Sequence, residues 1–123
     1  SDSNFLSTEE NKVLNYYAKQ SINDDCVQIF SHTSVFAYLL KKPSCTRFFA
    51  PVLASPVDLQ EKFIDELSLN LPSIVLYKSP YDLLMDDISN EERLSIVNNF
   101  ILQNYEEDQI FGNWVFLKIK KLQ

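Results

Sequence analysis

Glycine is almost absent from this chain, and that scarcity removes whole classes of nucleotide site. The 123 residues contain one glycine, Gly112. The dinucleotide fingerprint and the phosphate-binding loop each need several glycines at fixed spacings, because the backbone must approach the phosphates closely. Neither motif can be written with one glycine. We therefore expect no nucleotide site of these two kinds and no bound cofactor.

Metal-binding side chains are also scarce. The chain has two cysteines, Cys26 and Cys45, and a single histidine, His32. A structural zinc site takes four Cys or His ligands, so this set cannot supply one. Each cysteine lies just before or at the start of an expected strand. A disulfide between them is one interpretation, and a pair of buried free thiols is the other.

Long hydrophobic runs and basic clusters are missing as well. The apolar stretch 34–40 has seven residues, whereas a membrane-spanning helix needs about 20. No signal peptide is visible, and the start at Ser1 suggests a piece excised from a longer protein. The net charge of −6 argues against a nucleic-acid partner, because phosphate backbones are bound by clustered Lys and Arg.

The organising stretch of the chain reads strand, helix, strand, over residues 46–49, 55–69 and 73–78. Residues 74–77 form a continuous apolar run between two prolines, which is typical of a strand buried on both faces. Residues 46–49 predict a shorter strand. Two strands joined through a helix in one sheet are expected to be parallel, with a right-handed crossover.

The helix of this unit has clear start signals. Ser55 can accept a backbone N–H, Pro56 suits the first helical position, and Asp58 lies where a capping-box acid belongs. One apolar stripe with a 3.6-residue period follows. Its members are Leu59, Phe63 and Leu67.

The other elements complete a mixed α/β pattern. Further helices are expected from residue 7, over 34–41 and from residue 89, and further strands over 26–30 and 114–119. We expect strand 26–30 to be central, and Val35, Tyr38 and Leu39 to point inward from helix 34–41. The alternating strand 114–119, after a two-residue turn at Gly112, predicts an antiparallel edge with one wetter face.

The fold expected for residues 1–123 is therefore a single α/β domain. Its sheet is mixed and mainly parallel, with about five strands and a C-terminal antiparallel hairpin, and the helices pack on the sheet. The polar turn 31–34 lies at the C-terminal end of a strand, which is where ligands bind in open α/β sheets.

Three residues near that turn carry the candidate chemistry. Ser31 and His32 can supply a nucleophile and a base, although adjacency in sequence is poor evidence for a triad. A hydrogen-bonded loop histidine is the simpler interpretation of His32. Arg47 is a lone cation in an aromatic segment, so it either binds a phosphate or carboxylate ligand or pairs with a nearby acid.

An acidic cluster precedes the helix that starts near residue 89. Asp82, Asp86 and Asp87 lie ahead of Glu91 and Glu92. Carboxylates of this kind can bind Mg²⁺ or Ca²⁺, but the cluster lacks the spacing and glycine of an EF-hand. Acids ahead of a helix are also favoured by its dipole. We expect a solvated acidic loop and no metal site.

Several segments together resemble a known domain. They are Phe30-Ser31, residues 34–39, 46–49, 63–67 and 72–77, and the closing helix with Asn104-Tyr105 near its end, followed by a hairpin. This pattern resembles the C-terminal soluble domain of polytopic membrane glycosyltransferases of the GT-C class, similar to the dolichyl- or polyprenyl-phosphate mannosyltransferases. The resemblance covers most of residues 26–120.

The resemblance implies a specific setting. The parent protein would carry many transmembrane helices before Ser1, and its catalytic carboxylate would lie in that membrane part, so no residue here inherits it. This domain would lie on the extracytoplasmic side of the cell membrane. Its partners would be the membrane part of the same chain and a glycan or lipid-linked sugar. Family members carry a pattern similar to Tyr38 with Thr46-Arg47, which makes Tyr38 a further ligand-binding candidate.

Three functions follow as hypotheses. The first is a non-catalytic soluble domain of a membrane glycosyltransferase that contributes to acceptor or partner binding. The second is a free-standing cytosolic α/β module that binds a ligand near Ser31, His32 and Arg47. The third is a small hydrolase that uses His32 or the acidic cluster. The first of the three is favoured here.

Overall fold

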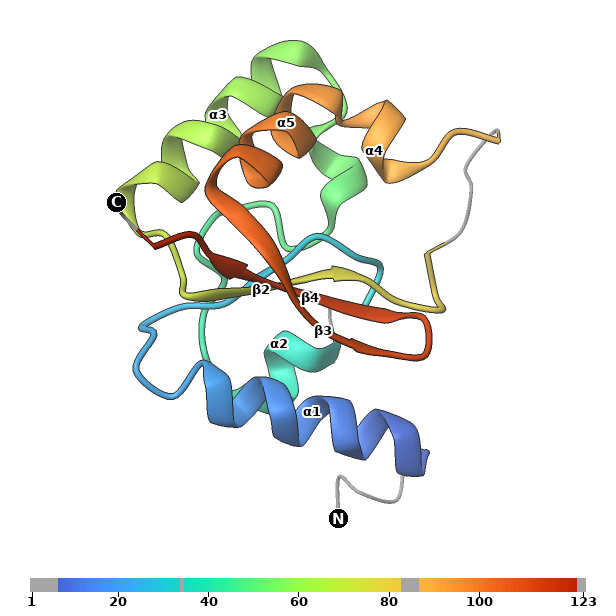
Figure 1. The fold of residues 1–123 in the computed structure, drawn as a ribbon. Helices are drawn as coiled ribbons and strands as arrows, with labels where there is room; N and C mark the ends of the chain where they lie inside the picture. Colours follow the sequence, from blue (N-terminus) through green and yellow to red (C-terminus); the bar gives the residue numbers. More distant parts are fainter. Residues whose placement is uncertain (1–6, 34, 83–86, 122–123) are drawn as a thin grey trace.

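The computed structural model describes residues 7–33, 35–82 and 87–121, which form three layers with a sheet in the middle (Figure 1). The strands are β1 (Gln28–Ile29), β2 (Ile74–Lys78), β3 (Tyr105–Phe111) and β4 (Trp114–Ile119). Below the sheet in Figure 1 lie α1 (Thr8–Gln20) and α2 (Val35–Leu40). Above it lie η2 (Pro51–Ala54), α3 (Val57–Leu69), α4 (Asn90–Arg93) and α5 (Ser95–Asn104).

The expected mixed α/β class is confirmed, but two details of the sheet are wrong. Among the described residues the sheet has four strands in the order β1-β2-β4-β3, not about five. Only β1 and β2 pair in parallel, while β2·β4 and β4·β3 are antiparallel, so the sheet is not mainly parallel. The C-terminal hairpin is present as predicted.

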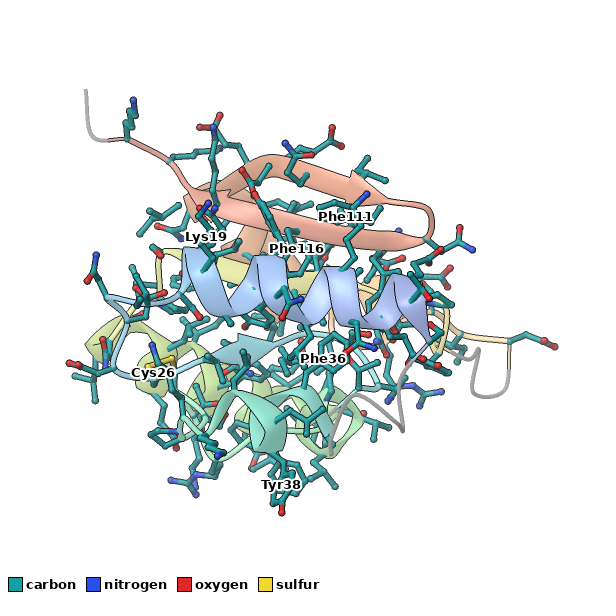
Figure 2. All side chains as sticks on the ribbon, turned by 90° about the horizontal axis from the view of Figure 1, so that it is seen from below. Lys19, Cys26, Phe36, Tyr38, Phe111 and Phe116 are labelled. Atoms are coloured by element: carbon teal, nitrogen blue, oxygen red, sulfur yellow. A yellow bond between two sulfur atoms is a disulfide. The ribbon has the colours of Figure 1, made fainter. Side chains whose placement is uncertain are left out.

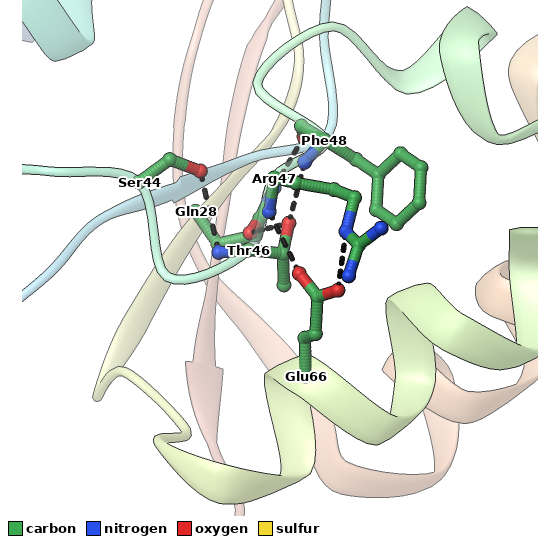
Figure 3. Close-up of polar contacts among 6 residues, drawn as sticks. All are labelled: Gln28, Ser44, Thr46, Arg47, Phe48 and Glu66. Carbon is green, nitrogen blue, oxygen red and sulfur yellow. Dashed lines mark hydrogen bonds and ion pairs between the residues drawn. The ribbon is translucent and has the colours of Figure 1, made fainter.

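The missing strand is the one predicted over residues 46–49, which form bends instead. Side chains hold its backbone (Figure 3): Thr46 Oγ1 accepts from the Phe48 N–H at 3.1 Å, and Gln28 Nε2 donates to the Phe48 carbonyl at 3.1 Å. The Arg47 N–H donates to Glu66 Oε1 at 2.8 Å. Because these backbone groups are already bonded, they are not available for a ladder of strand hydrogen bonds.

The parallel pair is therefore formed by β1 and β2, and the crossover between them contains α2, η2 and α3. In the strand order, β1 is an edge strand, so the prediction that segment 26–30 is central is wrong. Its outer side carries one isolated parallel bridge, Val27 to Ser44. Gln28 and Ile29 are nevertheless buried, because segment 43–48 lies along that side.

Strand β2 is buried on both faces, as its apolar run predicts. Val75 and Tyr77 belong to the core beneath α3 and α5, whereas Ile74 and Leu76 belong to the core against α1 and α2. Side chains of a strand alternate between the two faces of a sheet. One continuous hydrophobic run therefore supplies both cores at once.

Strand β4 is an interior strand, so its prediction as a half-exposed edge is wrong. Trp114 and Phe116 pack against the α1/α2 layer, and Leu117 packs into the opposite core. The edge strand on this side of the sheet is β3, whose Glu106 and Glu107 are exposed. Charges on a strand edge discourage pairing with another chain. The alternation in β4 reflects two different covering layers, and exposure is confined to the end of the strand, at Lys118 and Ile119.

Helix α2 buries a different residue from the one expected. Phe36 is fully buried and stacks on Trp114 at a ring-centroid distance of 5.1 Å. Tyr38 is 79% exposed and points away from the body of the molecule (Figure 2), so its predicted inward orientation is wrong. Successive residues of an α-helix are about 100° apart. Once Phe36 faces the core, Tyr38 is directed to the opposite side.

The helix caps are largely those that the sequence predicts. Ser7 forms a full capping box with Glu10 at the start of α1, and Ser89 Oγ accepts from the Glu92 N–H at the start of α4. Gly112 is the first residue of the two-residue hairpin turn and has φ 58°. Glycine adopts a positive φ without steric cost.

The start of α3 differs from its prediction. The helix begins at Val57, with Pro56 as its N-cap and no side-chain cap hydrogen bond. Ser55 Oγ instead donates to the Val52 carbonyl at 2.7 Å, within the turn that contains η2. The capping-box role predicted for Ser55 and Asp58 is therefore wrong, because a preceding 3₁₀ turn engages the serine first.

Candidate functional site

A single carboxylate ties together the two loops that follow the parallel strands. Asp82 Oδ1 accepts from the His32 backbone N–H at 2.9 Å and from Ser31 Oγ at 3.1 Å. Its other oxygen, Oδ2, accepts from the Ser79 N–H at 2.9 Å. Ser31 and His32 follow β1, and Ser79 follows β2, so Asp82 holds the C-terminal ends of both strands in place.

The buried Ser31 hydroxyl is engaged in this cluster. Ser31 Oγ lies 2.7 Å from Ser79 Oγ, which itself accepts from the Tyr81 N–H at 3.2 Å. One arrangement satisfies every group: Tyr81 donates to Ser79, Ser79 donates to Ser31, and Ser31 donates to Asp82. Ser31 has no exposed surface. Its hydroxyl is therefore closed off from any substrate in solution, which counts against Ser31 as a nucleophile.

A cleft opens beside this cluster, and we call it the β2 cleft. Its cavity volume is about 360 Å³. The walls come from the end of β2 and the loop after it, the first turn of α4 and the hairpin turn. The polar residues that line it are Lys78, Ser79, Asp82, Ser89, Asn90, Glu91 and Asn113. Lys78 Nζ lies 3.7 Å from Glu91 Oε2, so the positive charge in the wall is partly neutralised.

A second cleft lies on the other side of the hairpin turn, between α1 and the hairpin. Its cavity volume is about 560 Å³, and Glu9, Lys12, Phe111 and Gly112 help to line it. Lys12 Nζ lies 5.5 Å from the centroid of the Phe111 ring. Gly112 lines this cleft and its neighbour Asn113 lines the β2 cleft, so the hairpin turn separates the two.

The remaining ligand-binding candidates lie elsewhere in the fold. Arg47 Nε donates to Glu66 Oε2 on α3 at 2.5 Å, although 62% of the arginine side chain is exposed (Figure 3). Tyr38 lies on α2, in the layer on the other side of the sheet. The contacts of Ser31 and His32 are with Asp82 and those of Arg47 are with Glu66. The structure thus brings Ser31 and His32 together but does not assemble the four candidates into one site.

The two cysteines form a disulfide. Cys26 Sγ is bonded to Cys45 Sγ, and their Cα atoms are 4.9 Å apart (the yellow bond near Cys26 in Figure 2). The bond joins the residue ahead of β1 to the segment that covers the outer side of β1. Of the two interpretations that the sequence leaves open, the structure contains the disulfide.

The acidic loop does not gather its carboxylates in the part that the structure describes. Asp86 lies outside the described residues, Asp87 is exposed with φ 60°, and Asp82 binds the backbone of two loops. Within ranges 7–33, 35–82 and 87–121, no three side chains of His, Cys, Asp or Glu come together as a metal-binding group. Across the same ranges, no helix has the length and apolarity needed to cross a lipid bilayer.

Asp82 is the residue of this region whose role the sequence analysis missed. By sequence, Asp82 belongs to the acidic cluster ahead of Glu91 and Glu92. The available signal was the Ser79-x-x-Asp82 spacing directly after a buried strand, because Ser and Asp side chains bond nearby backbone N–H groups in turns. The bonds to Ser31 and His32 span about fifty residues of sequence, and no local pattern predicts them.

Buried tyrosines make the stability of the fold sensitive to alkali. Burial raises the pKa of Tyr77, beside the β2 cleft, to about 12, with the nearby Glu91 carboxylate as a second cause. Burial also raises the pKa of Tyr16, Tyr17 and Tyr105. The unfolded chain ionises these phenols near their ordinary pKa of about 10. Their stabilising contribution is therefore complete below about pH 10 and is lost as the pH rises through the folded values.

We expect the free energy of unfolding to fall steadily above about pH 10. Urea denaturation at a series of pH values measures it, and the ultraviolet absorbance of tyrosinate follows ionisation in the native protein. A native protein in which Tyr17, Tyr77 and Tyr105 ionised near pH 10 would contradict this prediction.

Comparison of the chain with protein-family models, with curated proteins and with solved structures gave no match.

Proposed function

We propose that this chain is a non-catalytic binding domain of a larger membrane glycosyltransferase, located on the extracytoplasmic side, and that it contributes to acceptor or partner binding. The observation that carries the binding part is the β2 cleft. In sheets with parallel strands, ligands bind outside the carboxyl ends of the strands. The β2 cleft lies at such an end. Two of its lining residues are bonded to each other, since Asp82 accepts a hydrogen bond from the Ser79 N–H.

The chemistry of the cleft wall supports a neutral, hydroxyl-rich ligand. Asn90 and Asn113 offer amide donors and acceptors, and Ser79 lies beside them. The wall contains one lysine, Lys78, and two carboxylates, those of Asp82 and Glu91, so a phosphate or an acidic sugar gains little there. Sugar hydroxyls donate and accept hydrogen bonds, which suits amide and carboxylate partners. An uncharged stretch of an acceptor glycan fits this wall best.

The disulfide supports the proposed extracytoplasmic location of the domain. Bonds such as Cys26–Cys45 form and persist mainly in secreted or lumenal protein and are rare in the cytosol. The extracytoplasmic side implied by the resemblance agrees with this chemistry. The alternative of a free-standing cytosolic module uses the same carboxyl end of the sheet but gives no reason for the bond.

The test of ligand binding is a titration of the isotope-labelled protein with a neutral mannose oligosaccharide, followed by amide chemical shifts in nuclear magnetic resonance. We expect shifts at Ser79, Asn90 and Asn113. Asn90→Ala should weaken binding roughly fivefold, the effect of one lost hydrogen bond. Asn99→Ala, which removes an exposed asparagine from α5, is the matched control and should bind normally.

Two results would count against the proposal. The first is a titration without chemical-shift changes, or with changes that scatter over the surface and are the same in Asn90→Ala. Either outcome would reject a glycan as the ligand of the β2 cleft. The membrane setting has its own test, the coding sequence upstream of Ser1. Several hydrophobic segments of about 20 residues are expected there, whereas an initiator Met directly before Ser1 would leave the free-standing module as the better interpretation.

A further inference from the structure

The segment that the disulfide fastens to β1 has a second set of anchors that contain no sulfur. The backbone of this edge segment, residues 43–48, pairs with Val27 through two hydrogen bonds of 2.9 Å, from the Val27 N–H to the Pro43 carbonyl and from the Cys45 N–H to the Val27 carbonyl. The Gln28 side chain accepts from the Thr46 hydroxyl at 2.9 Å and donates to the Phe48 carbonyl (Figure 3). Cutting the S–S bond leaves all four contacts in place.

The two cysteines of the bond are not equally exposed. Cys26 is 5% exposed, whereas Cys45 is only partly buried. Thiol–disulfide exchange requires a thiolate to reach one sulfur along the S–S axis, so access decides which sulfur is attacked. An external thiol therefore reaches Cys45 Sγ first, and Cys26 Sγ is the leaving group.

The surroundings of Cys26 suit its reduced form. Cys26 Sγ lies 3.8 Å from the Asn70 carbonyl oxygen, beyond the end of α3. In the disulfide this sulfur carries no hydrogen and cannot donate. As a thiol it can donate to that carbonyl, since S–H is a weak donor. The buried product of reduction thus has a hydrogen-bond partner already in position.

We propose that Cys26–Cys45 is a reversible thiol–disulfide site, reduced by a dithiol or by two molecules of a low-molecular-weight thiol, that controls how firmly segment 43–48 covers the outer side of β1. The first thiolate bonds to Cys45 Sγ, and the S–S bond breaks with its electron pair going to Cys26 Sγ, which takes up a proton. A second thiolate attacks the mixed disulfide and releases the oxidised reductant and the Cys45 thiolate. Two electrons pass from the reductant to the protein.

The structural consequence of reduction is local. Phe48 stays stacked on Phe63 of α3, with a ring-centroid distance of 5.2 Å, and Arg47 stays bonded to Glu66. Together with the four contacts above, these keep the two sulfurs close enough to re-form the bond. With the covalent link removed, however, segment 43–48 opens more often, because only non-covalent contacts then hold it. Each opening leaves an unpaired strand edge on β1.

The experiment uses the whole chain in buffers of increasing ratio of reduced to oxidised dithiothreitol. Free thiols are blocked and counted by mass spectrometry, and hydrogen exchange is measured at both extremes. We expect one reversible transition between zero and two blocked cysteines. The amides of Cys45, Arg47 and Phe48 should exchange at least about tenfold faster in the reduced protein, while those of Val75 and Ile101 should stay protected.

The double variant C26S/C45S should reproduce the exchange pattern of the reduced protein, and if it fails to fold, the reduced wild-type chain still decides the question. Three results overturn the proposal: a bond that resists the dithiol without denaturant, protection lost throughout both cores on reduction, or unchanged exchange at the edge segment. In each case the disulfide is a permanent structural link.

Discussion

Replacing Asp82 by alanine is expected to lower the free energy of unfolding by about 3 kcal/mol, because it removes three hydrogen bonds to a carboxylate at once. The Ser31 hydroxyl is fully buried and loses its acceptor. The backbone N–H groups of His32 and Ser79 also lose theirs, and water replaces only the accessible part. Each buried donor left without a partner costs about 1–3 kcal/mol.

Two further variants separate the role of Asp82 from a general effect of charge. Asp82→Asn keeps one acceptor oxygen and should lose about half as much stability. Asp65→Ala removes an exposed carboxylate from α3 and should change stability by no more than about 0.5 kcal/mol. Urea denaturation measures all three. Equal midpoints for Asp82→Ala and Asp65→Ala would show that the carboxylate does not hold the two loops.

Replacing Gln60 by leucine should be similarly damaging, although the two side chains have similar size. Gln60 is buried on α3, and its Oε1 accepts from the backbone N–H groups of Ile96 and Val97 at 3.0 and 3.3 Å. Its Nε2 donates to the Ser55 carbonyl at 2.8 Å and to the Arg93 carbonyl. Leucine leaves these groups unsatisfied, and we expect a loss of about 3 kcal/mol.

The reason lies at the junction of α4 and α5. Leu94 has φ −116° and ψ 48° and interrupts the helix, so α5 begins without a side-chain cap from its own sequence. The first N–H groups of a helix need outside acceptors, and Gln60 supplies one from another helix. The sequence analysis placed a single helix here, starting at Ser89, and no local signal at Leu94 indicates the interruption.

Thermal and urea denaturation of Gln60→Leu, Gln60→Glu and Gln103→Leu test this role. Glutamate keeps the acceptor oxygens and loses the donor, so its cost should be smaller than that of leucine. Gln103 is an exposed glutamine of α5, and its replacement should have little effect. A Gln60→Leu protein as stable as the Gln103→Leu protein would mean that Gln60 does not cap α5.

Part of the candidate site was foreseeable and part was not. In parallel strands, the loops after the carboxyl ends lie close together at one edge of the sheet. Ser31 and His32 lie in such a loop. Asp82 follows them by about fifty residues in the sequence. Its bonds to them depend on how the two loops meet in the folded chain. Gln60 lies three and seven residues before Phe63 and Leu67, which places it on the buried face of α3, but its partners on α5 are not visible in the sequence.

The sequence by itself determined the elements whose causes are local. Ser7 and Ser89 cap helices through bonds to residues three positions away, Gly112 permits the tight turn, and the apolar run of β2 requires burial on both faces. These outcomes depend on neighbours along the chain or on residue type alone, so a pattern is enough to predict them.

The tertiary structure decided everything that depended on distant partners. Residues 46–48 became a bend because Gln28 and Glu66 bond to their backbone. Tyr38 points outward because Phe36, on the opposite side of α2, stacks on Trp114. A strand's rank in the sheet, interior or edge, is likewise set by which other segments pair with it. Backbone hydrogen bonds and buried side chains must be satisfied somewhere, but the sequence does not state by which residues, and only the folded chain selects them.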